Sequence, residues 1–374
     1  MRNAANPNAT RHPLAMNSFR HWLRLLRWGG GVDRRYWRRA LFVTCLSPFS
    51  SVERLHERLV YGRRLRAWRL DEPPVFIIGH WRSGTTHLHN LLSHDPNLGY
   101  VTTFQTQAPK AFLVGRRTMQ PIMAARMPTK RPMDNLPLGA DLPQEEEFCL
   151  CNACMHSFYL WHYFPRQAEP LFRKYLLFEG VKEHEFEEWR KEYLELVRKA
   201  ALHMGGKRLV LKNPANTART GAVLRVFPGA KFIHIYRNPY AVYTSMLHLI
   251  ATLHPMFAFQ ELDESRTEQL ILDHYRDLMQ AYFANKDAIP TGQLSEVRYE
   301  DLERRPLEEL RRVYGELGLP GWETAQGSIA AYLATVKGYE KNAYTLAAAD
   351  RAKVEAYWAF ALERLGYPQG GLGG

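Results

Sequence analysis

The sequence has few cysteines and no long hydrophobic run. Its four cysteines in 374 residues, Cys45, Cys149, Cys151 and Cys154, are too few and too unevenly spaced for the disulfide framework of a small secreted protein. The longest apolar stretch near the start, ALFVTCLSPF, is about half of the roughly 20 residues that a membrane-spanning helix needs. No hydrophobic region with a small-residue cleavage site marks a signal peptide. We therefore expect a globular protein of a reduced, cytoplasmic compartment.

Lysine is absent from the first 70 residues, which contain 15 arginines and three acidic residues and so carry the whole net charge of +12. The stretch FRHWLRLLRW predicts an amphipathic helix. Its two faces hold Arg20, Arg24 and Arg27 on one side, and Phe19, Trp22, Leu23 and Leu26 on the other. Such a helix suits an anionic membrane surface, or lies on the body of the protein with its arginines in solvent. We expect no nucleic-acid binding, because no zinc-finger, helix-turn-helix or RNP signature accompanies the arginines.

After residue 72 the sequence alternates short apolar runs with helical stretches, which is typical of buried parallel strands joined by helices. Strands are expected at residues 75–79, 99–104, 208–211, 231–236 and 296–299, and helices at 85–93, 183–204, 217–227, 241–253, 268–286 and 306–317. The predicted fold class is α/β, with an open, P-loop-like parallel sheet flanked by helices and ligands at the carboxyl ends of the strands.

The predicted domain division follows the change in composition at the DEPP stretch, residues 71–74. Residues 1–72 form a basic helical N-terminal segment, and residues 73–374 form the α/β domain. Within that domain, residues 105–180 are rich in proline, methionine and aromatic residues and are expected to be an insertion beside the ligand site.

The stretch FIIGHWRSGTTHLHNLLSHDP, residues 76–96, is typical of a loop that binds phosphate. Gly79 and Gly84 let the backbone curl, so that amide groups and the start of a helix point at one anion. A Walker loop needs lysine after its second glycine, and Thr85 stands there instead, which disfavours triphosphate chemistry. The candidates for holding a less charged group are Arg82, Ser83, Gly84, Thr85 and Thr86. An ordinary strand-to-helix turn is the alternative.

A second stretch, KFIHIYRNPYAVYTSM, residues 231–246, pairs an arginine with a serine. Arg237 follows the end of a predicted strand, and Ser245 lies eight residues later in the helix that begins near Pro239. Together they could hold a second phosphate. Taken alone, they fit better a surface arginine and a serine inside a helix.

In combination, these two stretches resemble the 5′-phosphosulfate loop and the 3′-phosphate motif of sulfotransferases that use 3′-phosphoadenosine 5′-phosphosulfate (PAPS). LVLKNPANTA resembles the segment with the catalytic lysine of tyrosylprotein sulfotransferases, and VRYEDL resembles the strand whose tyrosine packs on the adenine. The resemblance runs from about residue 73 to residue 341. With PQEEEF, the first stretch looks most like a bacterial branch that includes lipid- and menaquinone-type sulfotransferases, and the cytosolic enzymes are more distant.

The resemblance implies that PAPS is the co-substrate and that no metal takes part. Residues 82–86 would hold the 5′-phosphosulfate, Arg237 and Ser245 the 3′-phosphate, and Tyr299 the adenine. Asn213 could assist, and GYEKN, residues 338–342, could close over the nucleotide.

The missing Walker lysine is consistent with sulfuryl transfer, because the group in flight carries less charge than a phosphoryl group. Cations near the bridging oxygen stabilise the leaving phosphate, and the resemblance assigns this role to Lys212 and Arg82. Taken alone, Lys212 would be a routine lysine at the end of a strand.

The acceptor hydroxyl also needs a general base. The glutamate that tyrosylprotein enzymes carry after the second strand has no match, because GYVTTFQTQAP offers only glutamines. The candidates are Glu145 and Glu147 in DLPQEEEF, with His80, His87 and His89 as rivals. In the alternative reading, Asp141 caps a helix that contains Pro143, and the acids merely complement the helix dipole.

The cysteine-rich stretch CLCNACMH could suggest zinc through Cys149, Cys151, Cys154 and His156. It lacks a second pair of ligands, and residues 148–160 are apolar enough for a buried helix, so we expect no metal.

The hydrophobic insertion and the amphipathic N-terminal segment together predict a hydrophobic or lipid-like alcohol as acceptor. Residues 1–70 would then contact the inner face of a membrane. The alternatives are a catalytically inactive PAPS-binding or other nucleotide-binding module recruited to membranes and, less favoured, a P-loop kinase.

Overall fold

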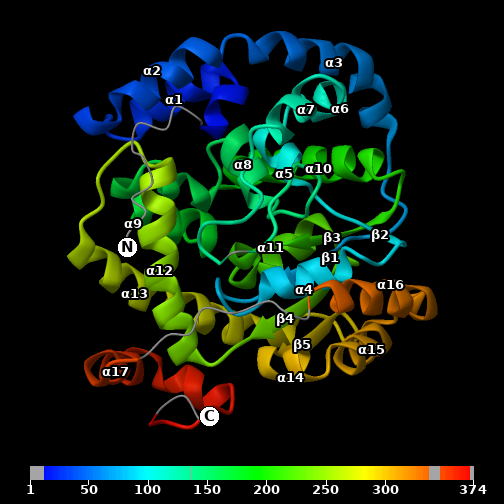
Figure 1. Ribbon diagram of the computed structural model, residues 1–374, viewed down its shortest axis with the longest axis vertical. Coiled ribbons are helices and arrows are strands. Elements are labelled where there is room, and N and C mark those ends of the chain that lie inside the picture. Colours follow the sequence, from blue (N-terminus) through cyan, green and yellow to red (C-terminus); the bar gives the residue numbers. More distant parts are fainter. Residues whose placement is uncertain (1–11, 135, 337–345, 371–374) are drawn as a thin grey trace. The chain divides into compact units, whose positions relative to one another are not determined.

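The computed structural model describes residues 12–134, 136–336 and 346–370 (Figure 1). Contacts within the chain group them into two compact units. The helical unit comprises the described parts of residues 1–70, 101–206 and 249–263, and the sheet unit those of residues 71–100, 207–248 and 264–374. These boundaries do not coincide with the division after residue 72, which stays a prediction.

The sheet unit is built on five strands, β1 (Val75–Ile78), β2 (Leu98–Gly99), β3 (Arg208–Lys212), β4 (Lys231–Tyr236) and β5 (Leu294–Arg298). Their order is β2-β3-β1-β4-β5, and every neighbouring pair is parallel. In the register, Ile77 of β1 lies beside Lys212 of β3 and beside Ile233 of β4. The predicted α/β class with an open parallel sheet is therefore confirmed.

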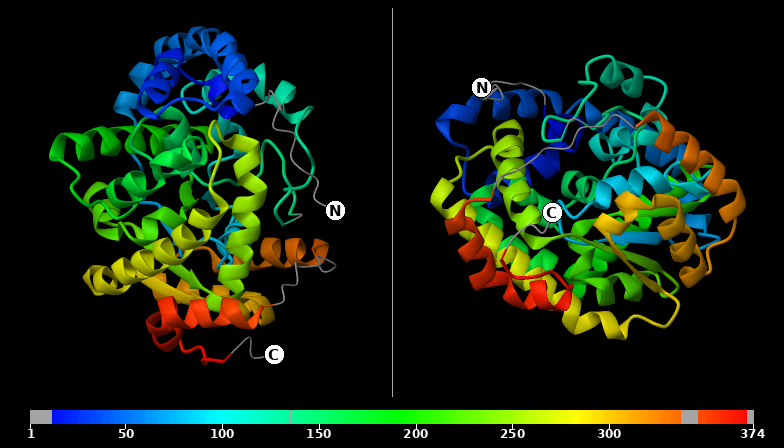
Figure 2. Two further views of the ribbon diagram at one scale, coloured as in Figure 1. Left: turned by 90° about the vertical axis from the view of Figure 1, so that its left-hand side faces the viewer. Right: turned by 60° about the horizontal axis from the view of Figure 1, so that its bottom comes forward.

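Helices cover both faces of this sheet (Figures 1 and 2). The helices of this unit are α4 (Thr85–Leu92), α11 (Thr220–Val226), α12 (Pro239–Phe257), α13 (Glu264–Asn285), α14 (Tyr299–Arg304), α15 (Pro306–Leu317), α16 (Trp322–Thr335) and α17 (Ala348–Arg364). Helix α12 continues into the helical unit, and α17 packs on α13. Alternate strand residues such as Val75 and Ile77 form one buried core with α4, α15 and α16. On the other face Phe76 packs on Phe227, and His234 stacks on Tyr282 of α13. This alternation follows from the two-residue period of a strand.

The strand order fixes where a ligand would bind. After β1 the chain forms β2 and then β3 on one side of β1, and it then crosses to β4 on the other side. In open α/β sheets, ligands bind outside the carboxyl ends of the strands at such a reversal. That edge carries the residues after Ile78, Lys212, Tyr236 and Arg298.

The helical unit contains short helices around the long helix α10 (Glu183–His203). The others are α1 (Phe19–Trp28), α2 (Trp37–Leu46), α3 (Ser50–Ala67), α5 (Thr103–Gln107), α6 (Phe112–Gly115), α7 (Met119–Ala124), α8 (Glu147–Ala153) and α9 (Ala168–Leu171), with single turns between them. Trp189 and Tyr193 of α10 are fully buried, and their rings pack against each other. Large aromatic side chains therefore supply much of the core of this unit.

The predicted strand at residues 99–104 is wrong beyond Gly99. Thr102 caps α5 instead, because Thr102 and Gln105 form a capping box: the Thr102 hydroxyl accepts the Gln105 N–H, and the Gln105 side chain accepts the Thr102 N–H, each at 3.3 Å. These reciprocal bonds satisfy two amide groups that a helix start otherwise leaves unpaired. The T-x-x-Q pattern in the sequence could have revealed this helix.

The alternative reading, in which Asp141 caps a helix that contains Pro143, is wrong, because α8 begins only at Glu147 and ends at Ala153. Asp141 and Leu142 lie in a turn, and the chain after them pairs with another segment: Pro143 forms a β-bridge with Thr102, and the Gln144 amide donates to the Val101 carbonyl at 2.9 Å. This pairing holds the segment in an extended conformation. The acidic residues 145–147 therefore stand at the junction between extended chain and helix.

Helix α1 packs on the body of the helical unit. Trp22 is completely buried and donates its ring N–H to the Thr44 hydroxyl at 2.8 Å, while Arg20, Arg24 and Arg27 are exposed. The apolar side of α1 thus serves the core of the unit. No helix in the described ranges is long and apolar enough to span a bilayer.

Four buried histidines predict that the protein loses stability in mild acid. Burial lowers the pKa of His12, His80, His89 and His162 from 6.5 to about 3. Between these values the unfolded chain takes up protons that the folded chain does not, so their contribution is present above pH 6.5 and is lost as the pH falls toward 3. Each such histidine lowers the free energy of unfolding by up to about 1.4 kcal/mol for each pH unit in this range. We expect the urea denaturation midpoint to fall between pH 7.5 and pH 5.5; a constant midpoint would contradict this.

Candidate active site

The loop between β1 and α4 has a backbone shape that depends on its two glycines. Gly79 has φ +134° and Gly84 has φ +100°. A Cβ atom on Gly79 would overlap the carbonyl oxygen of Ile235, and one on Gly84 would overlap the ring of Tyr299. Both glycines are therefore required where the loop passes close to β4 and to the residue after β5. Arg82 also has a positive φ, +69°, which is a strained conformation typical of functional loops.

Arg82 connects the two sequence motifs. Its Nε donates a hydrogen bond of 2.8 Å to the hydroxyl of Ser245, which lies in α12 and is buried. Residues 163 positions apart in the sequence are thus brought together at the carboxyl edge of the sheet. The neighbouring Ser83 side chain points the other way, because its hydroxyl lies 2.6 Å from the His80 carbonyl and 2.9 Å from that of Ile235. Ser83 therefore braces the loop through its hydroxyl.

Lys212 ends β3 beside the same loop. Its side chain is only 1% exposed, and its ammonium donates to the Thr86 hydroxyl at 3.4 Å. Because Thr86 lies in the first turn of α4, this contact places a cation near the positive end of a helix. An anion bound here would contact both the Lys212 ammonium and the amide groups at the start of α4.

Arg237 and Tyr299 form a third contact at this edge. The Arg237 guanidinium lies over the Tyr299 ring, 4.4 Å from its centre. The same ring packs against Gly84, and the Tyr299 hydroxyl donates to Glu303 at 2.7 Å. Tyr299 therefore links the residue after β4 with the loop after β1.

The three candidate histidines have different surroundings. His80 is buried, its Nδ1 lies 2.8 Å from the Trp81 carbonyl, and its ring packs against Tyr275. His89 is buried as well, and burial together with the charge of Lys212 lowers its pKa to about 3. His87 is half-buried, with its ring edge toward Tyr299. His80 and His89 are thus weak bases held within the protein.

The candidate carboxylates lie in the helical unit, and each accepts a hydrogen bond from a hydroxyl group. Tyr159 donates to Glu145, and Ser157 donates to Glu147 at 2.7 Å. Glu147 is completely buried, whereas Glu145 keeps 9% of its surface exposed. Of the two, Glu145 has the better access to an incoming molecule.

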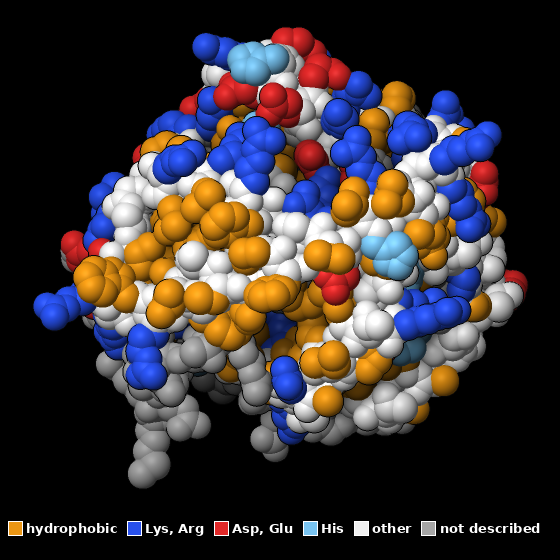
Figure 3. All heavy atoms as spheres, turned by 90° about the horizontal axis from the view of Figure 1, so that it is seen from above, with side chains coloured by type: hydrophobic (Ala, Val, Ile, Leu, Met, Phe, Trp, Pro, Cys, Tyr) orange, Lys and Arg blue, Asp and Glu red, His pale blue; other side chains and the backbone are white. Residues whose placement is uncertain are grey.

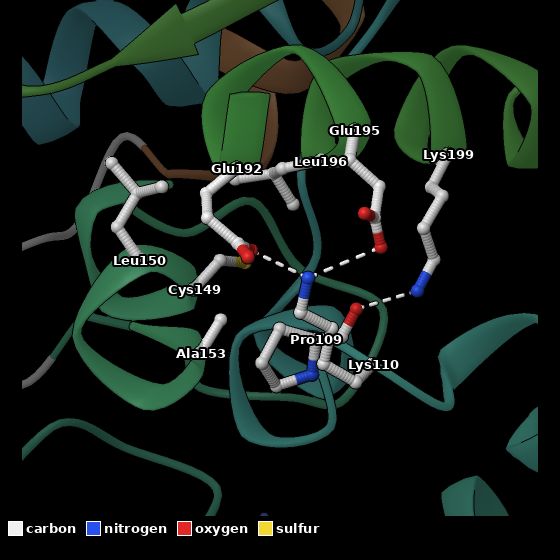
Figure 4. A pocket seen from close by; sticks show the side chains of 9 residues that line it. All are labelled: Pro109, Lys110, Cys149, Leu150, Ala153, Glu192, Glu195, Leu196 and Lys199. Atoms are coloured by element: carbon white, nitrogen blue, oxygen red, sulfur yellow. Dashed lines mark hydrogen bonds and ion pairs between the residues drawn. The ribbon is translucent and has the colours of Figure 1, made fainter. Parts of the chain in front are cut away.

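A small pocket within the helical unit has charged walls (Figure 4). It is lined by Pro109, Lys110, Cys149, Leu150, Ala153, Glu192, Glu195, Leu196 and Lys199. Lys110 lies between Glu192 and Glu195, and Lys199 pairs with Glu57 and donates to the Pro109 carbonyl at 2.6 Å. Burial disfavours the charge of Lys110, but the two carboxylates outweigh it and raise the pKa. This cluster is therefore an internal ion-pair network that ties α10 to its neighbours.

Two residues support the glycine loop. The sequence did not predict Thr217, and it predicted only an assisting role for Asn213. The Thr217 hydroxyl accepts the Gly79 N–H at 2.7 Å, and the Asn213 side chain accepts the Ala215 N–H at 3.0 Å. Both lie at the turn that follows Lys212, so this turn supports the glycine loop. The only sequence signal for Thr217 was its position in the KNPANT stretch.

Other candidates from the sequence lie elsewhere. Within the described residues, no group of three or more histidine, cysteine or acidic side chains is arranged to hold a metal ion. Cys149, Cys151 and Cys154 are free thiols whose pKa burial raises. The GYEKN stretch, residues 338–342, lies outside the described residues.

The geometry of the sheet edge fits a nucleotide that carries two anionic groups. One loop supplies amide groups at a helix start, with Arg82 and Lys212 beside them, and Arg237 supplies a further cation from the neighbouring strand. The Tyr299 ring lies so close to Gly84 that no larger side chain fits at this position. Several cations at one edge suit an organic phosphate or sulfate.

Comparisons with known proteins identify the family. The model of the sulfotransferase family matches residues 73–324. The chain is also 35% identical over 351 residues to the omega-hydroxy-beta-dihydromenaquinone-9 sulfotransferase Stf3 of Mycobacterium bovis and of Mycobacterium tuberculosis, which covers 94% of this chain and 90% of each relative. The chain therefore belongs to the sulfotransferase family, and the predicted family and enzyme class are confirmed.

Solved structures share the fold. Sulfotransferase STF9 from Mycobacterium avium matches with a TM-score of 0.67 at 20% identity, over 96% of this chain and 98% of that one. Sulfotransferase STF1 from Mycobacterium tuberculosis matches with a TM-score of 0.62 at 17% identity, over 95% and 93%. At these identities the likeness supports the fold alone.

Proposed function

We propose that this sulfotransferase moves a sulfuryl group from PAPS to the hydroxyl of a hydrophobic, lipid-like acceptor. The observation that carries the proposal is the hydrogen bond between Arg82 and Ser245, because it joins the two stretches that resemble the phosphosulfate and 3′-phosphate motifs. We further propose that the reaction is cytoplasmic, within a domain of residues 73–374 whose residues 105–180 contribute to acceptor binding.

In this proposal the sheet edge holds the donor. Residues 82–86 bind the 5′-phosphosulfate, Arg237 and Ser245 bind the 3′-phosphate, and Tyr299 binds the adenine. When bound, PAPS supplies an activated sulfuryl group on a good leaving group. The fully buried surroundings of Ser245 and the support of Arg237 by the Tyr299 ring keep these groups in place before the nucleotide arrives.

Lys212 and Arg82 stabilise the charge that develops on the leaving phosphate. Lys212 is nearly without contact to water, and a cation in such surroundings acts more strongly than an exposed one. The two cations together take the place of the Walker lysine, so we propose that no metal takes part. The acceptor oxygen gains the sulfuryl group as the bridging oxygen leaves with adenosine 3′,5′-bisphosphate.

The acceptor proton passes to a carboxylate, and we favour Glu145 over Glu147. Glu145 keeps part of its surface accessible, whereas Glu147 is completely enclosed. Tyr159 holds Glu145 by a hydrogen bond, which fixes the direction of the carboxylate. His80 and His89 are less suitable, because burial lowers the pKa of each to about 3.

The acceptor class follows from the relatives and from composition. The relatives at 35% identity are named for a hydroxylated dihydromenaquinone, and we propose a long-chain isoprenoid alcohol of this kind. The test is incubation of the protein with sulfur-labelled PAPS and a total lipid extract, followed by mass spectrometry for a gain of SO₃. Label found only on polar sugars or protein tyrosines would refute the lipid acceptor.

Tyr299 provides a prediction for donor binding. Tyr299→Ala removes the ring beneath Arg237 and should weaken binding of adenosine 3′,5′-bisphosphate about tenfold, which corresponds to about 1.4 kcal/mol. Tyr299→Phe keeps the ring and loses the hydroxyl that donates to Glu303, so it should bind almost normally. Calorimetric titration measures both variants, and equal affinity of Tyr299→Ala and the unaltered protein would contradict the proposed role.

A further inference from the structure

Helix α3 turns its apolar side to solvent. Val52, Leu55 and Leu59 are 71%, 59% and 74% exposed, and Val60 beside them is 54% exposed. Leu55 follows Val52 by three residues, Leu59 follows Leu55 by four, and Val60 follows Val52 by eight, so the four side chains lie on one helical face. A surface helix of a soluble protein normally buries such a face, so this orientation requires an explanation.

The inner side of α3 is polar and firmly held. Glu57 is 3% exposed, pairs with Lys199 of α10, and accepts the backbone N–H of Leu113 at 2.6 Å. Ser50, at the start of the helix, is buried and donates to the Ser47 carbonyl at 2.8 Å. Because a buried carboxylate loses its ion pair if it turns outward, rotating α3 to hide its leucines would be costly.

Helix α2 and the turn after it extend the same surface. We call the α2–α3 face the set of exposed apolar residues Trp37, Leu41, Leu46, Phe49, Val52, Leu55, Leu59 and Val60. Figure 3 views the molecule from the side on which α2 and α3 are drawn in Figure 1, and hydrophobic side chains gather there with lysine and arginine side chains around them. Contiguous apolar patches of this kind mark interaction sites.

The charge around this face is mainly positive, with one exposed acid, Glu261, paired with Arg35 beside α2. Between residues 34 and 69 the exposed charged side chains are Arg34, Arg35, Arg38, Arg58, Arg63, Arg64, Arg66 and Arg69. The two acids of this segment are Glu57, which is buried with Lys199, and Glu53, which is half-buried. An apolar centre with an arginine rim matches the surface of a bilayer that contains anionic lipids.

We propose that the α2–α3 face docks on an anionic lipid bilayer, with its apolar side chains at the boundary between headgroups and acyl chains. A second copy of this chain fits less well, because a two-fold interface would bring the arginine rims of both copies together. The surface differs from the one expected from the sequence, since α1 buries its tryptophan and α2 and α3 supply the exposed residues. Docking is independent of the acceptor's identity.

Cys45 offers a direct probe of docking. It is exposed in α2, eight residues after Trp37 and four after Leu41, whereas the other three cysteines are buried. An environment-sensitive fluorophore on Cys45 of the full chain should shift to the blue with vesicles of phosphatidylglycerol and phosphatidylcholine in equal amounts. Vesicles of phosphatidylcholine alone should bind at least about tenfold more weakly, because several arginines lose their partners.

The variant Leu55→Asp/Leu59→Asp should bind the anionic vesicles at least about tenfold more weakly, because two apolar side chains that would move from water into the bilayer are missing. Leu142→Asp is the matched control, because Leu142 is exposed outside the α2–α3 face, and it should bind like the unaltered protein. Adenosine 3′,5′-bisphosphate should bind all these proteins equally, which shows that the sheet unit is folded. Failure of nucleotide binding would instead concern the proposed function.

Three results would overturn docking on an anionic bilayer. They are equal binding to neutral and anionic vesicles, unchanged binding of the double aspartate variant, and absence of vesicle binding. If analytical ultracentrifugation shows a dimer that the double variant abolishes, and vesicles do not bind, the face is an interface between two copies.

Discussion

Lys212→Met lowers the turnover number by about 10²- to 10³-fold, the usual effect of removing one group that stabilises transition-state charge. Methionine keeps the length of the aliphatic chain and fills the buried site, so the loss reflects the missing ammonium group. Adenosine 3′,5′-bisphosphate still binds, because Arg82, Arg237 and the loop remain. Steady-state kinetics with PAPS and calorimetric titration measure the two quantities on the same preparation.

Lys207→Met is the control for this experiment. Lys207 is exposed and lies just before the amino end of β3, whereas Lys212 lies at the carboxyl end of the same strand. The control variant should keep its full turnover number. If Lys212→Met turns over normally, Lys212 is not the group that stabilises the leaving phosphate.

Gly79→Ala destabilises the sheet unit by about 3 kcal/mol or more, since it combines an unfavourable backbone conformation with a backbone overlap. The new Cβ would meet the carbonyl oxygen of Ile235, which belongs to the interior strand β4 and cannot move aside as a flexible side chain could. Relief would require the loop to move away from β4. We therefore also expect weaker nucleotide binding, measured alongside the thermal denaturation midpoint.

Gly221→Ala tests whether the effect belongs to Gly79. Gly221 lies inside α11, is exposed, and a Cβ atom there meets nothing within 4 Å. Alanine at this position in the first turn of α11 should stabilise by up to about 1 kcal/mol. If the two variants denature at the same temperature, the tight approach of the loop to β4 is not a feature of the protein.

The sheet and its ligand edge could be predicted from sequence because the responsible signals are local. Short apolar runs bounded by turns marked β1, β3, β4 and β5, and the glycine pair marked the loop. The absence of lysine after Gly84 argued against triphosphate chemistry, since a single side chain separates a Walker loop from this one, and the resemblance of the two motifs supplied the class of chemistry. Each of these signals is contained in a short stretch of the sequence.

The remaining features depend on contacts between distant parts of the chain. The hydrogen bond between Arg82 and Ser245 joins residues 163 positions apart, and sequence could only suggest it through the resemblance. The orientation of α3 depends on Lys199, which lies on α10. Periodicity correctly predicts that such a helix has an apolar face, but it does not tell which side the rest of the protein covers.

Local signals were also misjudged where two patterns competed. The stretch after Gly99 has strand-like β-branched residues, yet the capping box of Thr102 and Gln105 starts a helix. Asp141 resembles a helix cap, but β-bridge pairing of Pro143 with Thr102 keeps that segment extended. In both places hydrogen bonds of the backbone outweigh the preference of individual residues.

The most direct test of the account compares two acceptors that differ in one group. The protein is incubated with sulfur-labelled PAPS and either a terminally hydroxylated dihydromenaquinone or the same lipid without the hydroxyl. We predict a product heavier by SO₃ from the hydroxylated lipid alone, with one adenosine 3′,5′-bisphosphate released for each sulfate ester formed. PAPS that is left intact, or that is broken down without transfer to the hydroxylated lipid, would contradict the account.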